Sequence, residues 1–326
     1  MALLEAFRRA MADLGVTGRL FGADITSASP GFHKVDRGTV VPLVGDPAYI
    51  PTLLEIVRSH QVGLLVPLTD LDLRPLARSR EEFAASGCTV MVGSEQAVAL
   101  CQDKARTNAF LGRIGLATIK TRTLDEFLAE PFYPGFVKPT SGSAGIGARM
   151  IRDAQQFHAH VARYGRDLIV QDYVSGQEFT VDVYRSRAGT VHCVLPRQRL
   201  VVRSGEVEKG ITAKDAGVMA AAARLAAALE GVWGVFCCQC RRPADEPDCE
   251  PKFFEINPRF AGGAPLSIAA GANLPLYLLQ EVLGRAITGK VGEFADRLLM
   301  LRYDEAVFTH VEDPGTLPGY QTPMFR

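Results

Sequence analysis

Residues 253–263, FFEINPRFAGG, constrain the fold of this chain more than any other segment. This apolar run of β-strand composition includes a carboxylate and a carboxamide two positions apart. Glu255 and Asn257 therefore lie on the same face of an extended strand, which Pro258 ends. Arg259 and a pair of glycines follow. Oxygen ligands beside a cation at one strand end favour a magnesium–phosphate site, and the alternative is a strand that ends in an ordinary polar turn.

The composition is that of a water-soluble globular protein. The chain has 326 residues, 47% hydrophobic and 22% charged, enough for a large core divided into two or three subdomains. Its 36 basic and 36 acidic residues give a net charge of zero, so we expect no nucleic-acid and no membrane partner. Seven cysteines, an odd number without the spacing of a disulfide framework, indicate reduced thiols and a cytoplasmic location.

The first ninety residues alternate between helical and strand patterns. This alternation predicts a parallel sheet with right-handed crossovers. The region lacks a GxGxxG turn, so it gives no support to a dinucleotide-binding oxidoreductase. We expect helices at residues 2–14, 49–59 and 76–86, and strands at residues 19–24, 62–68 and 88–92.

The expected first strand of such a unit is missing from this sequence. A Rossmann-like domain normally opens with a strand and a glycine-rich turn, whereas this chain begins within the first helix. Because the first strand is usually central, its absence should leave a gap in the sheet or an exposed edge. We expect that the native start lies upstream of Met1.

A lysine followed by a Gly/Ser-rich loop provides a second candidate site. Lys138 ends a predicted strand at residues 136–138, and three glycines and two serines lie in the loop at residues 139–147. Backbone N–H groups and hydroxyls of such a loop can converge on phosphate oxygens while the lysine supplies a charge. The loop does not match the Walker A pattern. The alternative is a Gly/Ser hairpin with no ligand.

A predicted strand that ends at Gln171 leads into a turn with a carboxylate just beyond it. A purine can hydrogen-bond to the backbone of Tyr173 and Val174 there, and Glu178 can accept from ribose hydroxyls. The alternative is an ordinary loop with a solvated glutamate.

Gln239 lies in an apolar strand predicted at residues 232–240. If that strand pairs with the strand at residues 252–257, Gln239 lies on the same face as Glu255 and Asn257. A buried glutamine needs hydrogen-bond partners, which a magnesium shell or its water can supply. The alternative partner is a backbone group.

The three cysteines beside Gln239 predict core packing rather than a zinc site. Adjacent positions on a strand point to opposite faces, so Cys237, Cys238 and Cys240 do not converge as metal ligands.

Residues 196–210 form the one locally basic region, with Arg197, Arg199, Arg203 and Lys209. Arginine suits the recognition of a carboxylate or acyl phosphate. The alternative is a mobile, solvated loop.

Taken in order, these elements resemble the ATP-grasp superfamily, and most closely its carbamoyl-phosphate synthase large-subunit-like branch. The resemblance extends from about residue 2 to residue 285, with FEINPRF and the following glycines as its most specific part. It implies an α/β fold with a Rossmann-like pre-ATP-grasp domain at residues 1–93 and a two-lobed α+β ATP-grasp domain at residues 94–326. The small lobe is expected at about residues 118–172 and the large lobe at about residues 173–290, followed by a C-terminal tail.

The resemblance also implies a role for each matching residue. Gln171 is a departure, because the family often has glutamate there. The expected phosphate contacts are Lys104 and Lys138, with the residues from Ser141 through Gly142, Ser143, Ala144 and Gly145 closing over ATP. The adenosine contacts are Gln171, Tyr173, Val174 and Glu178, and the magnesium ligands are Gln239, Glu255 and Asn257. The expected catalytic residues are Arg259, Lys138 and Lys209, and the substrate contacts are Arg197, Arg203, Gly262 and Gly263.

The function implied is an ATP-dependent ligase that activates a carboxylate as an acyl phosphate and joins it to an amine or other nucleophile. ATP and Mg²⁺ are the expected cofactors, with Mn²⁺ as an alternative metal. The substrates are a small-molecule carboxylate and an amine. A homodimer is one assembly that the sequence allows. The competing hypotheses are a synthase that forms carboxy- or carbamoyl phosphate and a non-catalytic ATP-binding subunit.

Overall fold

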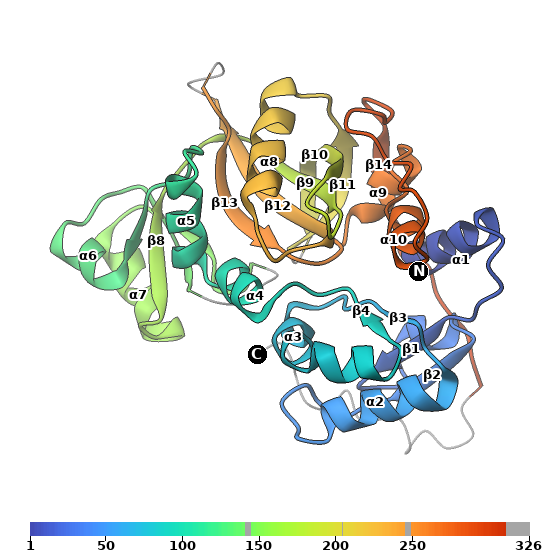
Figure 1. Ribbon diagram of the computed structural model, residues 1–326. Helices are drawn as coiled ribbons and strands as arrows, with labels where there is room; N and C mark the ends of the chain where they lie inside the picture. The colour runs from blue at the N-terminus through green and yellow to red at the C-terminus, as the bar shows by residue number, and fades with distance from the viewer. Residues whose placement is uncertain (141–144, 204, 245–248, 311–326) are drawn as a thin grey trace.

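The computed structural model describes residues 1–140, 145–203, 205–244 and 249–310. Figure 1 shows three parts: an N-terminal domain, a small lobe at the left and a large lobe above the N-terminal domain. The described strands form four separate sheets. The predicted α/β class is confirmed.

The N-terminal domain has two parallel pairs of strands. β1 (Phe21–Asp24) pairs with β2 (Arg37–Val40), and β3 (Leu64–Leu65) pairs with β4 (Thr89–Val90). In the described residues the two pairs do not join into one sheet, in agreement with the predicted gap. The remaining elements are the short helix η1 (Pro30–His33) and the helices α2 (Tyr49–His60) and α3 (Asp70–Ala85).

The helix α3 begins six residues before the predicted position. Its N-cap is Thr69, and Asp70 and Asp72 in its first turn suit the positive end of the helix dipole. Pro75 lies inside this helix, where the sequence pattern favoured a later start. Asp70 is therefore a helical residue at the domain surface that faces the large lobe.

The first helix leaves the N-terminal domain and packs on the large lobe. α1 (Ala2–Asp13) contacts α9 (Ala264–Ala269) and α10 (Leu274–Val282), and Figure 1 shows it beside α10 at the right. Phe7 meets Phe260 edge to face, with ring centroids 6.0 Å apart. The two parts thus share one hydrophobic core, and the boundary at residue 93 stays a prediction.

Two helices join the N-terminal domain to the small lobe. α4 (Glu95–Gln102) and α5 (Lys104–Arg113) meet at Asp103, whose carboxylate caps α5 by accepting from the backbone N–H groups of Ala105 and Arg106. Asp103 thus ends α4 and begins α5.

The small lobe is a four-stranded antiparallel sheet in the order β5-β8-β6-β7. Its core is built around Phe127, Val137 and Phe157. Its elements are β5 (Thr121–Thr123), α6 (Leu124–Ala129), β6 (Gly135–Pro139), β7 (Arg149–Ile151), α7 (Ala154–Tyr164) and β8 (Leu168–Asp172).

The large lobe is a six-stranded sheet in the order β13-β12-β9-β10-β11-β14. Helix α8 (Ala216–Ala228) packs against β9 and β10, while α9 and α10 contact β10, β11 and β12. Its strands β9 and β12 are buried along most of their length. The strands are β9 (Gly176–Arg185), β10 (Val191–Arg203), β11 (Glu206–Thr212), β12 (Gly234–Pro243), β13 (Lys252–Asn257) and β14 (Leu299–Leu301).

The basic segment at residues 196–210 is not a solvated loop. Its described residues belong to β10 and β11, which pair as an antiparallel hairpin with irregular register near Val201. Arg197 pairs with Thr180 of β9 on one side and Thr212 of β11 on the other, so β10 is an interior strand of the sheet. The loop alternative is therefore wrong, because backbone pairing on both sides fixes this segment.

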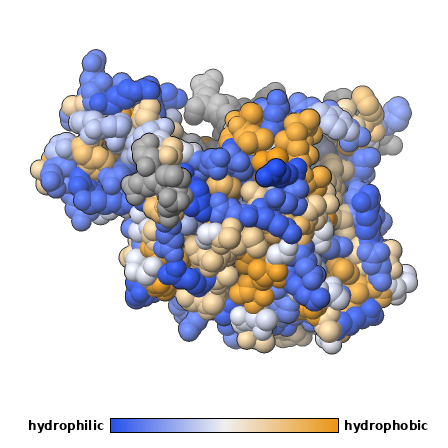
Figure 2. Space-filling view, turned by 90° about the horizontal axis from the view of Figure 1, so that it is seen from above, coloured by the Kyte–Doolittle hydropathy of each residue, from blue (hydrophilic) through white to orange (hydrophobic). Residues whose placement is uncertain are grey.

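The surface is mixed. In Figure 2 the small lobe at the left presents mostly hydrophilic residues, and apolar residues gather over the middle of the molecule. Among the residues that the structure describes, no helix has the length and apolar character needed to cross a bilayer.

Core packing of the cysteines is confirmed. All seven are free thiols, and every one except Cys249 is buried. Over the described ranges, no group of three or more His, Cys, Asp or Glu side chains is arranged to hold a metal ion. Burial raises the pKa of the Cys88 thiol to about 11 and that of the Cys101 thiol to about 12.

This packing predicts the reactivity of the thiols. In the native protein we expect rapid reaction of one thiol, Cys249, with the disulfide reagent DTNB, and reaction of all seven after unfolding in guanidinium chloride. Cys249→Ser should remove the rapid phase. Two or more rapidly reacting thiols in the native protein would contradict this arrangement.

Candidate functional site

The predicted magnesium ligands lie side by side on two strands. Gln239 of β12 is directly opposite Glu255 of β13, and the register is irregular just after Gln239. Asn257 Nδ2 donates to Glu255 Oε1 at 2.8 Å, which shows that the two side chains share a face. The predicted grouping of the three residues is therefore confirmed, while their role as metal ligands stays a prediction.

A cavity of about 60 Å³ opens beside this group. Both glycines that follow β13 line it, together with two arginines of β10 and a carboxylate of β11. Its lining comprises Thr180, Arg197, Arg199, Gly205, Glu206, Val207, Cys237, Gln239, Glu255, Asn257, Arg259, Ala261, Gly262 and Gly263. Four predicted site residues, Arg197, Arg259, Gly262 and Gly263, therefore meet the predicted metal ligands here.

The glycines allow a close approach that any side chain would block. A Cβ at Gly263 would lie 2.1 Å from Arg197 Nη1, and a Cβ at Gly262 would lie 1.7 Å from Glu206 Oε2. Atoms that are not bonded to each other do not approach so closely. The glycine pair is thus required by the packing of this cavity wall.

Lys138 is a nearly buried cation beside Glu255. Its residue is 6% exposed, and its ammonium group lies 5.2 Å from the centroid of the Phe254 ring. Burial lowers the pKa of Lys138 to about 8, although the negative charges of Glu255 and Glu178 oppose this shift. Lys138 therefore loses its proton within an accessible pH range unless a bound anion holds it.

Lys104 lies near the same carboxylate from the other side of the site. It is the first residue of α5 and is 9% exposed. Burial lowers the pKa of Lys104, and the charges of Glu255 and Asp70 act in the opposite direction. The two lysines predicted to bind phosphate thus both lie within electrostatic reach of Glu255.

The residues predicted to hold adenosine lie along the chain between the two lobes. The Gln171 side chain is buried and donates to the Thr121 hydroxyl at 2.7 Å, and its backbone lies in β8 between β5 and β6. Tyr173 and Val174 occupy the connection between β8 and β9, and Tyr173 is 44% exposed. Adenine contact by these residues stays a prediction.

Glu178 is held by two arginines. Its carboxylate pairs with Arg199 at 3.1 Å and accepts a hydrogen bond from Arg241. A ribose hydroxyl would share this carboxylate with those guanidinium groups. Glu178 also lies near enough to Lys138 for its charge to act on the pKa of that lysine, in the direction that raises it.

Arg197 is a buried structural residue as well as part of the cavity wall. It is 1% exposed, and Nε and Nη2 donate to the two carboxylate oxygens of Asp182 at 2.8 and 3.1 Å. Ser267 also donates to Asp182. Arg197 thus lies on a strand inside the lobe with the Nε–Nη2 edge of its guanidinium engaged, and its role as a substrate contact stays a prediction.

Arg203 and Lys209 lie outside the cavity wall as the described residues define it. Arg203 is exposed and pairs with Asp304, with Nη2 and Oδ1 2.9 Å apart. Lys209 is an exposed residue of β11, opposite Leu301 of the edge strand β14. The structure does not bring these two basic residues together with the predicted metal ligands.

The predicted loop over the phosphates lies mostly outside the described residues. This applies to Ser141, Gly142, Ser143 and Ala144. Gly145 is described and has φ +69°, a conformation that favours glycine.

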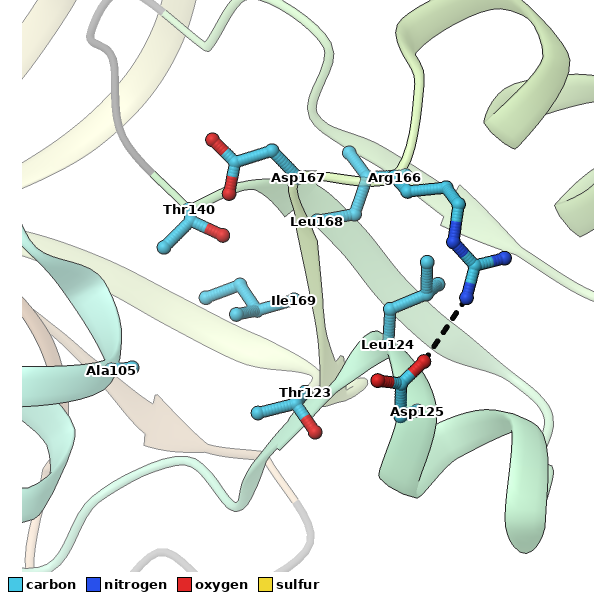
Figure 3. Close-up of a pocket in the computed structure, with 9 residues that line it drawn as sticks. All are labelled: Ala105, Thr123, Leu124, Asp125, Thr140, Arg166, Asp167, Leu168 and Ile169. Carbon is cyan, nitrogen blue, oxygen red and sulfur yellow. Dashed lines mark hydrogen bonds and ion pairs between the residues drawn. The ribbon is translucent and has the colours of Figure 1, made fainter.

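A second cavity of about 280 Å³ lies between α5 and the small lobe (Figure 3). An exposed ion pair between Arg166 and Asp125, 3.0 Å apart, crosses its rim, and none of the predicted ATP or metal residues lines it. The charge of Asp167 in this wall also acts to raise the pKa of Lys104. The smaller cavity is the better candidate for chemistry, because converging carboxylates, carboxamides and arginines line it.

The donor set of the smaller cavity fits Mg²⁺. One carboxylate, Glu255, lies beside the carboxamides of Asn257 and Gln239, and all three provide oxygen donors. Mg²⁺ is commonly bound by one or two carboxylates together with phosphate oxygens and water. These residues can therefore hold a magnesium ion that a nucleotide helps to bind.

The sequence analysis missed the carboxylate partners of the arginines. Arg259 Nε donates to Asp70 Oδ1 at 2.9 Å and Nη2 to Oδ2 at 2.7 Å. Asp70 is 189 positions away in the chain, and Asp182 is 15 positions from Arg197. No local pattern distinguishes these two aspartates from solvated ones.

Two family models match this chain. Residues 1–91 match the model described as the PylC-like N-terminal domain. Residues 165–305 match the model described as ATP-grasp in the biosynthetic pathway with Ter operon.

A curated relative and two solved structures are similar to parts of the chain. A D-alanine–D-alanine ligase from Gluconobacter oxydans is 29% identical over 110 residues, which cover 32% of this chain and only 36% of the relative. The biotin carboxylase domain of 2-oxoglutarate carboxylase from Hydrogenobacter thermophilus has a TM-score of 0.70 at 16% identity, covering 91% of this chain and 70% of the other. An L-amino acid ligase from Bacillus licheniformis has a TM-score of 0.65 at 19% identity, covering 85% and 70%. The two structural similarities establish a shared fold.

The buried ion pair predicts a large loss of stability on mutation. Asp182→Ala leaves the Arg197 guanidinium buried and unpaired, so we expect the free energy of unfolding to fall by about 3–5 kcal/mol in urea denaturation. Asp304→Ala breaks the exposed pair with Arg203 and should leave the unfolding midpoint unchanged. Equal midpoints for the two variants would contradict the structural role of Arg197.

The lowered pKa of Lys138 predicts pH-dependent nucleotide binding. ADP without divalent cation should bind the protonated lysine better, so its Kd should rise about tenfold from pH 7 to pH 9 as the proton leaves. Lys138→Arg keeps its charge over this range and should flatten the profile. Isothermal titration calorimetry measures the Kd for ADP of both proteins at each pH. The same pH dependence in the wild type and in Lys138→Arg would exclude Lys138 as the titrating contact.

Proposed function

We propose that this chain, which belongs to the ATP-grasp superfamily, is an ATP- and Mg²⁺-dependent ligase that activates a carboxylate as an acyl phosphate. An amine or another nucleophile then displaces phosphate. The observation that supports this proposal most is the meeting of Glu255, Asn257 and Arg259 in one cavity, with Lys138 and Lys104 within electrostatic reach of Glu255.

Each group has a role that its position suits. Lys104 and Lys138 bind phosphate oxygens of ATP. Burial lowers the pKa of each lysine, and a bound phosphate raises it again because the anion stabilises the protonated form. Glu255, Asn257 and Gln239 would hold Mg²⁺, which supplies neutralisation of phosphate charge. Arg259 lines the same cavity and meets the acyl phosphate there.

The reaction requires no covalent protein nucleophile. The substrate carboxylate attacks the γ-phosphate of ATP and ADP leaves, so positioning and electrostatic stabilisation account for catalysis. Cys237 lines the cavity, but burial raises the pKa of its thiol to about 12, which keeps it protonated. Its place in the wall is therefore one of packing.

A carboxy- or carbamoyl-phosphate-forming enzyme is the second candidate. It is supported by the fold shared with the biotin carboxylase domain, which was solved with MgADP, ADP and bicarbonate. Bicarbonate in place of an organic acid would give carboxyphosphate by the same step. Under this candidate function, the chain would belong to the carbamoyl-phosphate synthase large-subunit-like branch of the superfamily.

The ligase hypothesis includes three further proposals. These are the use of Mn²⁺ as an alternative metal, a homodimeric assembly and a cytoplasmic location. The third candidate, a non-catalytic ATP-binding subunit, is less suited to the site, because nucleotide binding alone does not require Arg259 beside the metal ligands.

The ligase hypothesis predicts a defined effect of two substitutions. Glu255→Ala and Asn257→Ala each remove an oxygen ligand, so we expect ADP formation to fall at least 100-fold while the circular dichroism spectrum is retained. Glu293→Ala changes an exposed glutamate that pairs with Lys290 and serves as the matched control. Full activity in either site variant would end the magnesium assignment.

The acid can be sought without knowledge of the amine. ADP release is measured with a panel of carboxylates and bicarbonate in the presence of hydroxylamine, which traps an acyl phosphate as a hydroxamate. Hydroxamate formation supports the ligase, and ADP release with bicarbonate alone supports the second candidate. ATP-induced thermal stabilisation without ADP release from any acid would favour the non-catalytic subunit.

A further inference from the structure

We propose that Asp70 of the N-terminal domain is the positioning residue of Arg259, and that the N-terminal domain thereby completes the active site. The inference rests on the proposed function, in which Arg259 meets the acyl phosphate. Asp70 is the first residue of α3, and its carboxylate engages Arg259 through two hydrogen bonds of 2.9 and 2.7 Å. Such a bidentate pair fixes both the place and the plane of a guanidinium group.

Some N–H groups of the Arg259 guanidinium donate to the protein, and the others remain for the cavity. A guanidinium has five N–H groups. Nε and one N–H of Nη2 donate to Asp70, and one N–H of Nη1 donates to the Phe260 carbonyl at 3.0 Å. Two N–H groups, one on Nη1 and one on Nη2, remain for the cavity that Arg259 lines. They can serve as donors to a carboxylate or phosphate.

Asp70 is itself held in place. Its carbonyl accepts a hydrogen bond from the Gln102 side chain of α4, and Gln102 Oε1 in turn accepts from Arg74 Nε at 2.7 Å. Asp70 and Arg259 are both largely buried, with side chains 18% and 16% exposed. The Asp70 carboxylate is therefore fixed in place, and it sets the position of the Arg259 guanidinium.

Docking of the N-terminal domain does not depend on this ion pair. The Trp233 indole donates to the Val92 carbonyl at 3.0 Å, and Ser94 N donates to the Gly231 carbonyl at 2.8 Å. Phe7 packs against Phe260 in the core that both parts share. These contacts keep the domain in place when Asp70 is changed, so a positioning role can be separated from a structural one.

The kinetic test is Asp70→Asn. Asparagine keeps the shape but has one acceptor, and its amide N–H groups face the N–H groups of Arg259. We expect kcat for ADP formation to fall tenfold or more, with the KM for ATP changed less than threefold, as is typical when an orienting partner is lost. If Asp70 acts through Arg259, the double variant Asp70→Asn/Arg259→Ala should have the same kcat as Arg259→Ala alone.

The matched control is Glu95→Gln. Glu95 of α4 pairs with Arg78 of α3 at 2.7 Å, so its substitution removes an ion pair of α3 that lies away from the cavity. We expect its kcat to equal that of the wild type. A kcat of Asp70→Asn within twofold of the wild type, or effects of the two single variants that multiply in the double variant, would overturn the proposal.

A spectroscopic measurement keeps the test independent of turnover. The Nε–H signal of Arg259 in a ¹H–¹⁵N spectrum is identified by its loss in Arg259→Lys. It should be protected from solvent exchange in the wild type and in Glu95→Gln, and it should broaden or vanish in Asp70→Asn. An unchanged signal in Asp70→Asn overturns the positioning role whatever the enzyme acts on. Absence of ADP release by the wild type with every acid, together with loss of the signal in Asp70→Asn, would refute the function and leave the positioning intact.

Discussion

The site depends on the register between β12 and β13. With Gln239 opposite Glu255 and Cys237 opposite Asn257, the polar side chains of both strands lie on the cavity face and their apolar neighbours enter the core. A shift of one residue would exchange the two faces and bury the carboxylate among the residues around α8. The irregularity after Gln239 leaves Phe254 of β13 as the extra residue, so that Phe253 pairs with Cys240 and both side chains lie in the core.

The charges of the site are balanced before any nucleotide arrives. Lys104 and Lys138 are both nearly buried, and the burial of an isolated cation is costly. Glu255 offsets part of that cost for both lysines. A nucleotide adds phosphate charge to this arrangement, and a bound divalent cation would compensate the excess around Glu255. Affinity for ATP and affinity for the metal are therefore expected to be coupled in this site, although each ligand touches different residues.

The strand and loop motifs were accessible from the sequence because their information is local. Glu255 and Asn257 share a face by the period of a strand, and Lys138 precedes a glycine-rich segment that the chain itself displays. The partner of Arg259 was not accessible, because Asp70 follows a short strand in another domain and resembles any helix-initiating aspartate.

The basic hairpin illustrates the same limit within one lobe. Arg197, Arg199 and Arg203 lie at even spacings along β10, which suits a strand, but the density of charge left a solvated loop open as an alternative. The buried partner Asp182 lies on β9, and only the pairing of the two strands brings it to Arg197. An arginine is buried where a carboxylate from another part of the chain pairs with it, and a single sequence does not identify such pairs.

The pair of helices α4 and α5 connects both walls of the site mechanically. Gln102, the last residue of α4, binds the backbone of Asp70, and Asp103 then caps the helix in which Lys104 is the first residue. Three consecutive residues thus link the carboxylate that orients Arg259 to a lysine expected to hold phosphate. A shift of α4 relative to α3 would move both groups at once, so placement of the acyl phosphate and placement of the nucleotide are coupled through this short stretch of backbone. The N-terminal domain is on this account a part of the catalytic apparatus, joined to it by the geometry of residues 102–104.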